Sequence, residues 1–279
     1  TSNIEKGRVI SRRLFILAAA KIFLFTAITS RLYNLQISDR EKYEILSDKN
    51  RFKDKTKSVA ILKPSILRSN FDLVCAPEHD FVKGYEDNTF LFKGSLAKVS
   101  DNDADANIGL IALGGLNNHY EFLSEDIIKQ IEYIINLKNR QKWYIFNSRR
   151  TPKNLNLKLN KLTNSSIEFI DCNNKNHLSL DDVLRKASIK VVTPDSVNLV
   201  FESLSSKSDT VLLHLDSKKE NKITKLMSSL ISTGDIGYIK KDRVLDNLQT
   251  YKLTPPHPHH QIYAEVEKVA FKISKLIKE

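Results

Sequence analysis

Short apolar runs rich in Ile, Val and Phe recur along the chain from residue 58 onward, and amphipathic stretches separate the later runs. Runs of this length are typical of buried strands. Strand–helix–strand repeats of this kind favour a parallel sheet, with the crossover helices covering both of its faces. The pattern therefore predicts an α/β fold with a doubly wound parallel sheet. We predict strands over residues 59–62, 72–76, 90–92, 108–113, 143–146, 167–170, 189–192 and 211–215, and helices over residues 124–139, 152–162, 180–187, 196–205, 220–231 and 261–278.

The positive charge of the chain is concentrated at its N-terminal end. Residues 1–57 carry 13 Lys and Arg against 6 Asp and Glu, a balance of +7, whereas residues 58–279 have a balance of only +4. Aromatic residues are not interleaved on a basic face, so nucleic-acid binding is not favoured. Residues 14–30 form an apolar run with basic residues on both sides, which leaves the membrane topology open. We expect a membrane anchor there; the alternative is an apolar helix packed on the domain.

The residues around this run carry a first resemblance. They include Arg12-Arg13, the apolar stretch, the sequence RLYNLQ from Arg31, Glu41, Tyr43, Leu46-Ser47 and Asn50-Arg51. Over residues 1–51 this pattern resembles the membrane anchor of elongation-type penicillin-binding proteins, which implies a single pass through a bacterial inner membrane. We thus expect an N-terminal anchor segment over 1–51 with an apolar helix over 14–30, a basic junction over 52–57, and an α/β domain over 58–279.

Candidate ligand-binding motifs follow several of the predicted strands. Parallel sheets bind ligands outside the carboxyl ends of their strands, where loops lead into helices. After the strand at 108–113 come Gly114 and Gly115, whose backbone N–H groups could approach a phosphate closely. Asn117, Asn118 and His119 could bond a nucleotide or a sugar. The alternative is an ordinary tight turn.

A second motif, Asn147-Ser148-Arg149-Arg150-Thr151-Pro152, follows the strand at 143–146. Ser148 or Thr151 could cap the next helix, with Pro152 in its first turn. Two arginines at a helix N-terminus oppose the helix dipole unless an anion lies between them, and arginine suits bidentate phosphate contact. The alternative is a solvated basic loop.

A third motif follows the strand at 189–192. Asp195 and Ser196 stand at the start of a predicted helix, and Glu202 lies about two turns into it. Ser196 and the helix N–H groups could hold a phosphate while Glu202 accepts a pair of ribose hydroxyls. The alternative is that Asp195 and Ser196 simply cap the helix.

A fourth motif, Glu78-His79-Asp80, follows the strand at 72–76 and could serve as a general base or bind a sugar. The alternative is a solvated acidic loop. His257, His259 and His260 are more typical of a loop than of a metal site, so no metal is predicted.

In this order the four motifs carry a second resemblance, over residues 58–279, to the bacterial branch of the mitochondrial fission family. Its bacterial members are described as nucleoside-diphosphate-sugar epimerases, and its fold resembles the Rossmann-like, two-lobed GT-B glycosyltransferases. The resemblance implies that Gly114, Gly115, Arg149, Arg150, Ser196 and Glu202 line a donor cleft. The sequence ahead of residue 58 does not resemble the opening strands and Gly-rich loop of the first lobe, so we expect that lobe to be truncated. Leu204–Asp209 stands where the family has a small residue followed by Gly-Lys/Arg-Pro.

Two functions follow from the resemblance. The first is a membrane-held glycosyltransferase homologue that takes a nucleoside-diphosphate sugar as donor, needs no cofactor, and acts on envelope carbohydrate. Arginines and helix N–H groups would stabilise the departing diphosphate, while Glu78, Asp80 or His79 deprotonates the acceptor. The second is a non-catalytic membrane adaptor with a protein partner, because eukaryotic relatives are linked to recruiting the mitochondrial division machinery. A periplasmic anchor and a cytoplasmic domain point to different compartments, so a cytoplasmic location and a gene fusion stay as alternatives.

Overall fold

A computed structural model of the chain describes residues 56–64, 68–80, 87–100, 103–174, 178–245, 248–259 and 261–278. Within it, Ser58–Glu279 make up one compact unit. The predicted anchor over residues 1–51 and residues 52–55 of the basic junction lie outside the described residues. Among the helices of the described residues, none combines the length and the apolar character that a membrane crossing requires.

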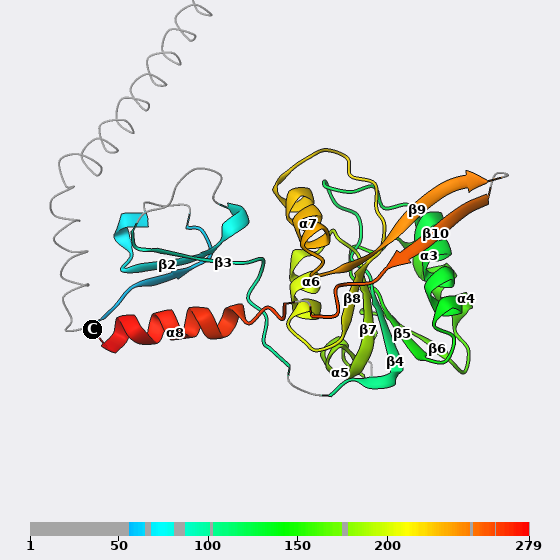
Figure 1. Ribbon diagram of the computed structural model, residues 1–279, viewed down its shortest axis with the longest axis horizontal. Helices are drawn as coiled ribbons and strands as arrows, with labels where there is room; N and C mark the ends of the chain where they lie inside the picture. Colours follow the sequence, from blue (N-terminus) through cyan, green and yellow to red (C-terminus); the bar gives the residue numbers. More distant parts are fainter. Residues whose placement is uncertain are drawn as a thin grey trace, which may run out of the picture. The chain divides into compact units, whose positions relative to one another are not determined.

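The larger sheet has seven strands in the order β10-β9-β8-β7-β4-β5-β6, as Figure 1 shows. All neighbouring strands from β6 to β9 pair in parallel, and β10 pairs antiparallel with β9. The prediction of a parallel α/β sheet is therefore confirmed, except at the edge occupied by β10. The strands are β4 Asp105–Ala112, β5 Lys142–Phe146, β6 Ile167–Ile170, β7 Ala187–Val192, β8 Asp209–Leu212, β9 Gly237–Leu245 and β10 Leu248–Thr254.

The strand order contains a topological switch point between β4 and β7. From β4 the chain moves outward to β5 and β6, then returns to the other side of β4 to form β7 and continues to β8 and β9. The loops that follow β4 and β7 thus lead away in opposite directions. In doubly wound sheets this divergence opens the crevice in which ligands bind. Three of the predicted motifs follow β4, β5 and β7, at this edge of the sheet.

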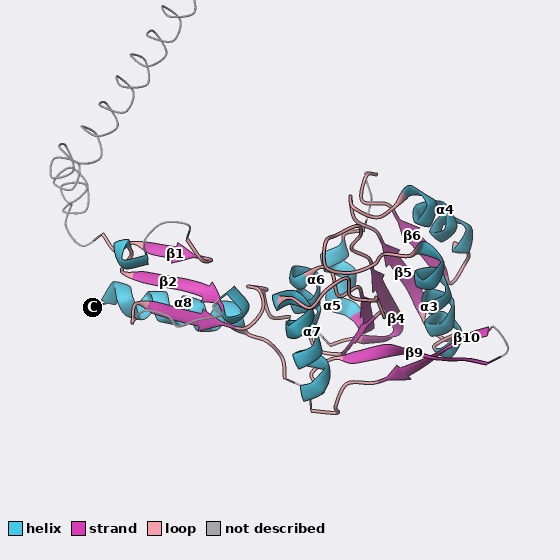
Figure 2. Ribbon diagram, turned by 90° about the horizontal axis from the view of Figure 1, so that it is seen from above, coloured by secondary structure: helices cyan, strands magenta, loops and turns pink. Residues whose placement is uncertain are grey.

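Helices cover both faces of the larger sheet (Figure 2). Helices α3 (Ser124–Leu137) and α4 (Lys153–Leu162) pack on one face through Ile127, Ile131 and Leu155. Helices α5 (Leu180–Lys186), α6 (Val197–Leu204) and α7 (Lys222–Thr233) pack on the other. Successive side chains of a strand point to opposite faces, so Leu110 lies in one core and Ile111 in the other. Burial on both faces explains why the strands read as unbroken apolar runs.

A smaller sheet holds three parallel strands in the order β1-β2-β3. These are β1 Val59–Ile61, β2 Leu73–Pro77 and β3 Thr89–Phe92, with 3-10 turns at Arg68–Asn70 and Glu78–Asp80. The last helix, α8 (Glu265–Lys278), packs on this sheet, where Val269 meets Leu73, Cys75 and Phe92. The first strands and the last helix of the described chain therefore share one core.

The predicted helices and strands are found with bounds that differ by a few residues. The predicted strand at 211–215 begins earlier, at Asp209, and ends at Leu212. Strands β9 and β10 were not predicted, because their segments contain Lys240, Lys241 and Lys252 and lack a continuous apolar run. A hairpin at the end of a sheet leaves part of its surface to solvent and tolerates such residues.

Candidate functional site

The backbone N–H groups of the double glycine after β4 bond to side chains in another loop of the chain. The Gly114 N–H donates to Thr193 Oγ1 (2.7 Å) and the Gly115 N–H donates to Asp195 Oδ2 (3.0 Å). A Cβ atom on Gly114 would lie 2.3 Å from the Asp195 carboxylate, and one on Gly115 would lie 2.1 Å from the carbonyl of Arg150. Both residues must therefore be glycine so that the loops after β4, β5 and β7 can meet. Their N–H groups are engaged within the chain rather than free for a phosphate.

The hydroxyl groups of the second motif also converge on this loop. Ser148 Oγ donates to the Gly114 carbonyl (2.6 Å) and Thr151 Oγ1 donates to the same oxygen (2.5 Å). The expectation that Ser148 or Thr151 caps α4 is wrong: Pro152 occupies the N-cap position and no side chain caps the helix. The two hydroxyls instead join the loop after β5 to the loop after β4.

An ion pair joins the loop after β5 to the loop after β7. Arg150 Nη2 lies 3.1 Å from Asp195 Oδ2, and Arg150 Nη1 donates to the Leu116 carbonyl (3.3 Å). The Asp195 side chain is completely buried, whereas Arg150 is 47% exposed. Asp195 Oδ1 is buried and has no hydrogen-bond partner among the residues described. Arg150 is thus held by a carboxylate of the chain, where the sequence predicted a bound anion.

The start of α6 carries no side-chain cap. Ser196 occupies the N-cap position, but its hydroxyl accepts no bond from the helix, and Asp195 points to Gly115 and Arg150 instead. The capping interpretation is therefore wrong for both side chains. The first N–H groups of a helix have no partners within the helix. Those of α6 lie at the carboxyl end of β7, beside the switch point.

The polar residues after the double glycine form a turn of their own. Asn117 Oδ1 accepts from the N–H groups of His119 and Tyr120, both at 2.7 Å. Asn118 is exposed, and His119 Nδ1 is buried without a partner in the described part of the chain. Asn117 thus shapes the loop, while Asn118 is free to contact a ligand.

Arg149 is the exposed cation of the second motif, and among the described residues it forms no ion pair. Arg149 lies near the loop after β6, because its positive charge acts on the Cys172 thiol in that loop. Burial and the charge of Asp171 raise the pKa of this thiol, and the charge of Arg149 partly offsets the rise. Arg149 therefore remains available for an anion at the strand-end edge, unlike Arg150.

A cavity of about 290 Å³ lies at the carboxyl end of β8. Its walls include Tyr120 and Pro194 from the loops after β4 and β7, together with His214 and Asp216. His214 Nε2 lies 3.1 Å from Asp216 Oδ1. Burial and the charge of Asp195 raise the pKa of Tyr120 to about 12, so its hydroxyl stays protonated. Sequence reasoning missed His214 and Asp216, although they follow a strand just as the other motifs do.

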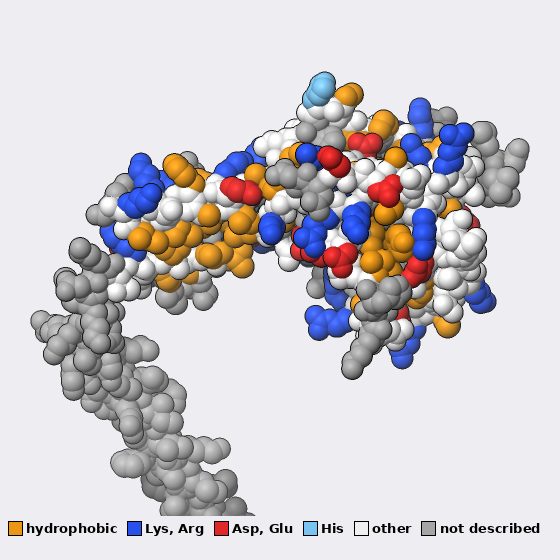
Figure 3. All heavy atoms as spheres, turned by 90° about the horizontal axis from the view of Figure 1, so that it is seen from below, with side chains coloured by type: hydrophobic (Ala, Val, Ile, Leu, Met, Phe, Trp, Pro, Cys, Tyr) orange, Lys and Arg blue, Asp and Glu red, His pale blue; other side chains and the backbone are white. Residues whose placement is uncertain are grey.

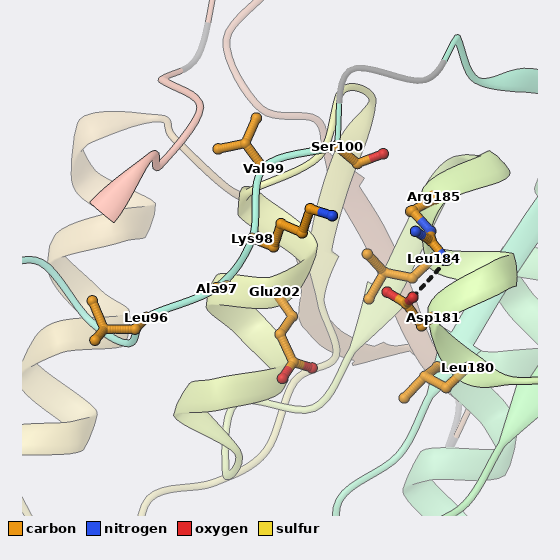
Figure 4. A pocket seen from close by; sticks show the side chains of 10 residues that line it. All are labelled: Leu96, Ala97, Lys98, Val99, Ser100, Leu180, Asp181, Leu184, Arg185 and Glu202. Carbon is orange, nitrogen blue, oxygen red and sulfur yellow. Dashed lines mark ion pairs between the residues drawn. The ribbon is translucent and has the colours of Figure 1, made fainter. Parts of the chain in front are cut away.

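Glu202 lies apart from the strand-end loops. It lines a hollow of about 560 Å³ whose walls come from residues 96–100, α5 and α6. Figure 4 shows Glu202 on α6 across from α5, where Asp181 forms an ion pair with Arg185 (2.6 Å). Burial and the nearby charge of Asp181 raise the pKa of Glu202. The structure therefore does not bring Glu202 to the same hollow as Ser196, Arg149 or Arg150.

The fourth motif forms the 3-10 turn Glu78–Asp80 against α7. Asp80 pairs with Lys222 at the start of α7, while Glu78 and His79 line a cavity of about 100 Å³ with Leu226 and Leu230. The larger cavity at β8 is lined by Met227 and Ile231, on the other side of the same helix. Helix α7 thus separates the predicted acceptor base from the strand-end loops. Burial lowers the pKa of His79, the Asp80 charge partly offsetting this, so the imidazole is neutral near pH 7.

Among the residues that the structure describes, no group of three or more His, Cys, Asp or Glu side chains is arranged to hold a metal ion. His257 lies in the loop before α8, where a Cβ on Gly234 would meet its ring.

The architecture and this edge define a doubly wound α/β protein whose loops converge at the switch point of a mainly parallel sheet. The family model described as Mitochondrial fission ELM1 matches residues 43–268, and the chain belongs to that family. The match begins at residue 43, earlier than residue 58, where the sequence predicted the start of the domain. No curated protein matches the chain.

Proposed function

We propose that the chain is a membrane-anchored, GT-B-like protein that binds a nucleoside-diphosphate sugar at the switch point between β4 and β7. The uncapped N-terminus of α6 is the observation that supports this most directly. Free helix N–H groups at the carboxyl end of a parallel strand attract phosphate oxygens. The Ser196 hydroxyl and the unpaired Arg149 add a donor and a positive charge at this edge.

The nucleoside would occupy the cavity at the carboxyl end of β8. Its volume of about 290 Å³ is compatible with one base and a sugar, and Pro194 connects its wall to Asp195 and Ser196. The diphosphate would then lie over α6, with the sugar toward the loop that bears Asn118. In this arrangement Arg150 shapes the site through Asp195, and Arg149 contacts the ligand.

Calorimetric titration of the full chain in detergent with uridine, guanosine and adenosine diphosphates and their sugars tests the proposal. We expect micromolar binding of one of them, weakened about tenfold to a hundredfold by Arg149→Ala, the usual effect of losing a charged hydrogen bond. Arg140→Ala removes a similarly exposed arginine from the turn after α3 and should leave binding unchanged. A folded chain that binds no nucleotide would rule the donor site out.

A non-catalytic adaptor is the second candidate. The observation that favours it is the internal use of the predicted ligand groups: both glycine N–H groups and Arg150 bond the chain itself, and α7 separates Glu78, His79 and Asp80 from the strand-end loops. In that case the chain would bind no nucleotide but would retain a protein partner on membranes. Co-purification of the same partner by wild type and Arg149→Ala would support the adaptor.

A further inference from the structure

The outer face of α8 exposes large apolar side chains. Phe271 is 73% exposed and Ile277 is 67% exposed, and Ala270 lies exposed beside them. The opposite side of the helix packs on the smaller sheet through Val269. Figure 3 shows hydrophobic side chains gathered on the part of the surface where α8 lies. An exposed apolar face of this kind marks an interaction surface.

Lysines surround this face. Lys275 and Lys278 follow Phe271 by four and seven residues, which places them on the same side of the helix. Lys272 is also exposed, and none of these lysines forms an ion pair within the described residues. Glu267 is the acidic residue at the N-terminal end of the face. Helices that lie in the membrane interface combine phenylalanine or leucine with a lysine-rich polar face, and the exposed part of α8 offers both residue types.

The sheet-facing side of α8, opposite the exposed face, packs against the first described strand. Val59 of β1, the first strand after that segment, packs in the same apolar cluster as Val269, Ile273 and Leu276 of α8. The sequence of the segment holds the apolar run at residues 14–30 with basic residues on both sides.

We propose that the outer face of α8 docks on an anionic lipid bilayer. Phe271 and Ile277 enter the headgroup region, and Lys272, Lys275 and Lys278 contact the anionic headgroups. Each lysine near an anionic surface strengthens binding about fivefold, so the three together contribute about a hundredfold. The inference rests on the membrane attachment in the proposed function and is independent of nucleotide binding.

An environment-sensitive label on the full chain tests the docking. Cys75 is buried, so Cys172→Ser leaves no reactive thiol among the described residues and Phe271→Cys can be labelled with a nitrobenzoxadiazole dye. Leu157→Cys on α4, where the leucine is 68% exposed, gives the matched control. Each labelled chain is reconstituted in phosphatidylcholine vesicles with or without one-third phosphatidylglycerol. We expect a blue-shifted, stronger emission from position 271 only in the anionic vesicles, and no change at position 157.

Charge variants separate the lysines from general electrostatic attraction. The response at position 271 should be abolished by the triple variant Lys272→Ser/Lys275→Ser/Lys278→Ser. It should be preserved in the control Lys129→Ser/Lys138→Ser/Lys161→Ser, which removes three lysines from α3, its C-cap and α4. An unchanged emission at 271 in anionic vesicles would overturn the proposal. So would a shift that grows with protein concentration without lipid, which would assign the face to a second copy. Failure to float with phosphatidylcholine vesicles would count against the anchor at 14–30 alone.

Discussion

Replacing Arg150 should destabilise the chain much more than replacing Asp195, because only Asp195 is buried in their ion pair. Arg150→Met leaves a fully buried carboxylate with a single donor, the Gly115 N–H, and breaking a buried pair in this way costs about 3–5 kcal/mol. Asp195→Asn leaves an arginine that is 47% exposed and can be hydrated, and the amide oxygen still accepts from Gly115. That change should cost only about 1 kcal/mol.

Urea unfolding followed by fluorescence measures the difference. Trp143 is the only tryptophan of the chain and is completely buried in the larger sheet, so its emission reports on that sheet. The double variant should be about as stable as Asp195→Asn alone, so the coupling energy should equal the cost of Arg150→Met, about 3–5 kcal/mol. Lys158→Met, which breaks the exposed pair with Glu125, is the control and should cost less than about 1 kcal/mol. Equal costs for Arg150→Met and Asp195→Asn, or strict additivity, would refute the reasoning.

Two further predictions concern stability. Gly94→Ala should destabilise the chain by about 2–4 kcal/mol in the same urea assay, because Gly94 has φ +66° and a Cβ would lie 2.0 Å from the Phe201 ring; a loss below about 1 kcal/mol would contradict this. Burial lowers the pKa of Lys190 to about 7, so between pH 7 and 10 the unfolded chain binds more protons than the folded one. Stability should therefore rise with pH over this range by up to about 1.4 kcal/mol per unit, and Lys190→Met should remove that slope.

The strands of the larger sheet could be predicted because a strand that is buried on both faces needs a continuous run of apolar residues. The helices between them could be predicted from their amphipathic pattern. Lys190 shows where such reasoning ends. It lies in the predicted strand and is completely buried, yet its ammonium donates to the carbonyls of Ser203, Ser206 and Lys207 at the end of α6. Backbone carbonyls carry no sequence signature, so nothing in the sequence could foresee this arrangement.

The meeting of the loops after β4, β5 and β7 at one edge of the sheet was predictable, but the pairings of their side chains were not. The rule for parallel sheets places Gly114, Arg149 and Asp195 at one edge, and the structure brings their loops together. That Asp195 turns back to Gly115 and Arg150 depends on the register of β4 against β7, which the spacing of motifs does not contain. The sequence predicted that Glu78 and Glu202 lie at this edge as well. Spacing along the chain does not show that α7 separates Glu78 from the edge, or that Glu202 faces α5 instead.

The sharing of one core by the first strands and the last helix has a consequence for synthesis. While the ribosome is still translating the chain, β1, β2 and β3 emerge well before Val269, which covers them. The smaller sheet must remain uncovered until α8 emerges, whereas the larger sheet can assemble as soon as β9 emerges. Contacts that join such distant parts of a chain form slowly. A nascent chain released before α8 would therefore keep its larger sheet and expose Leu73 and Phe92 to chaperones and proteases.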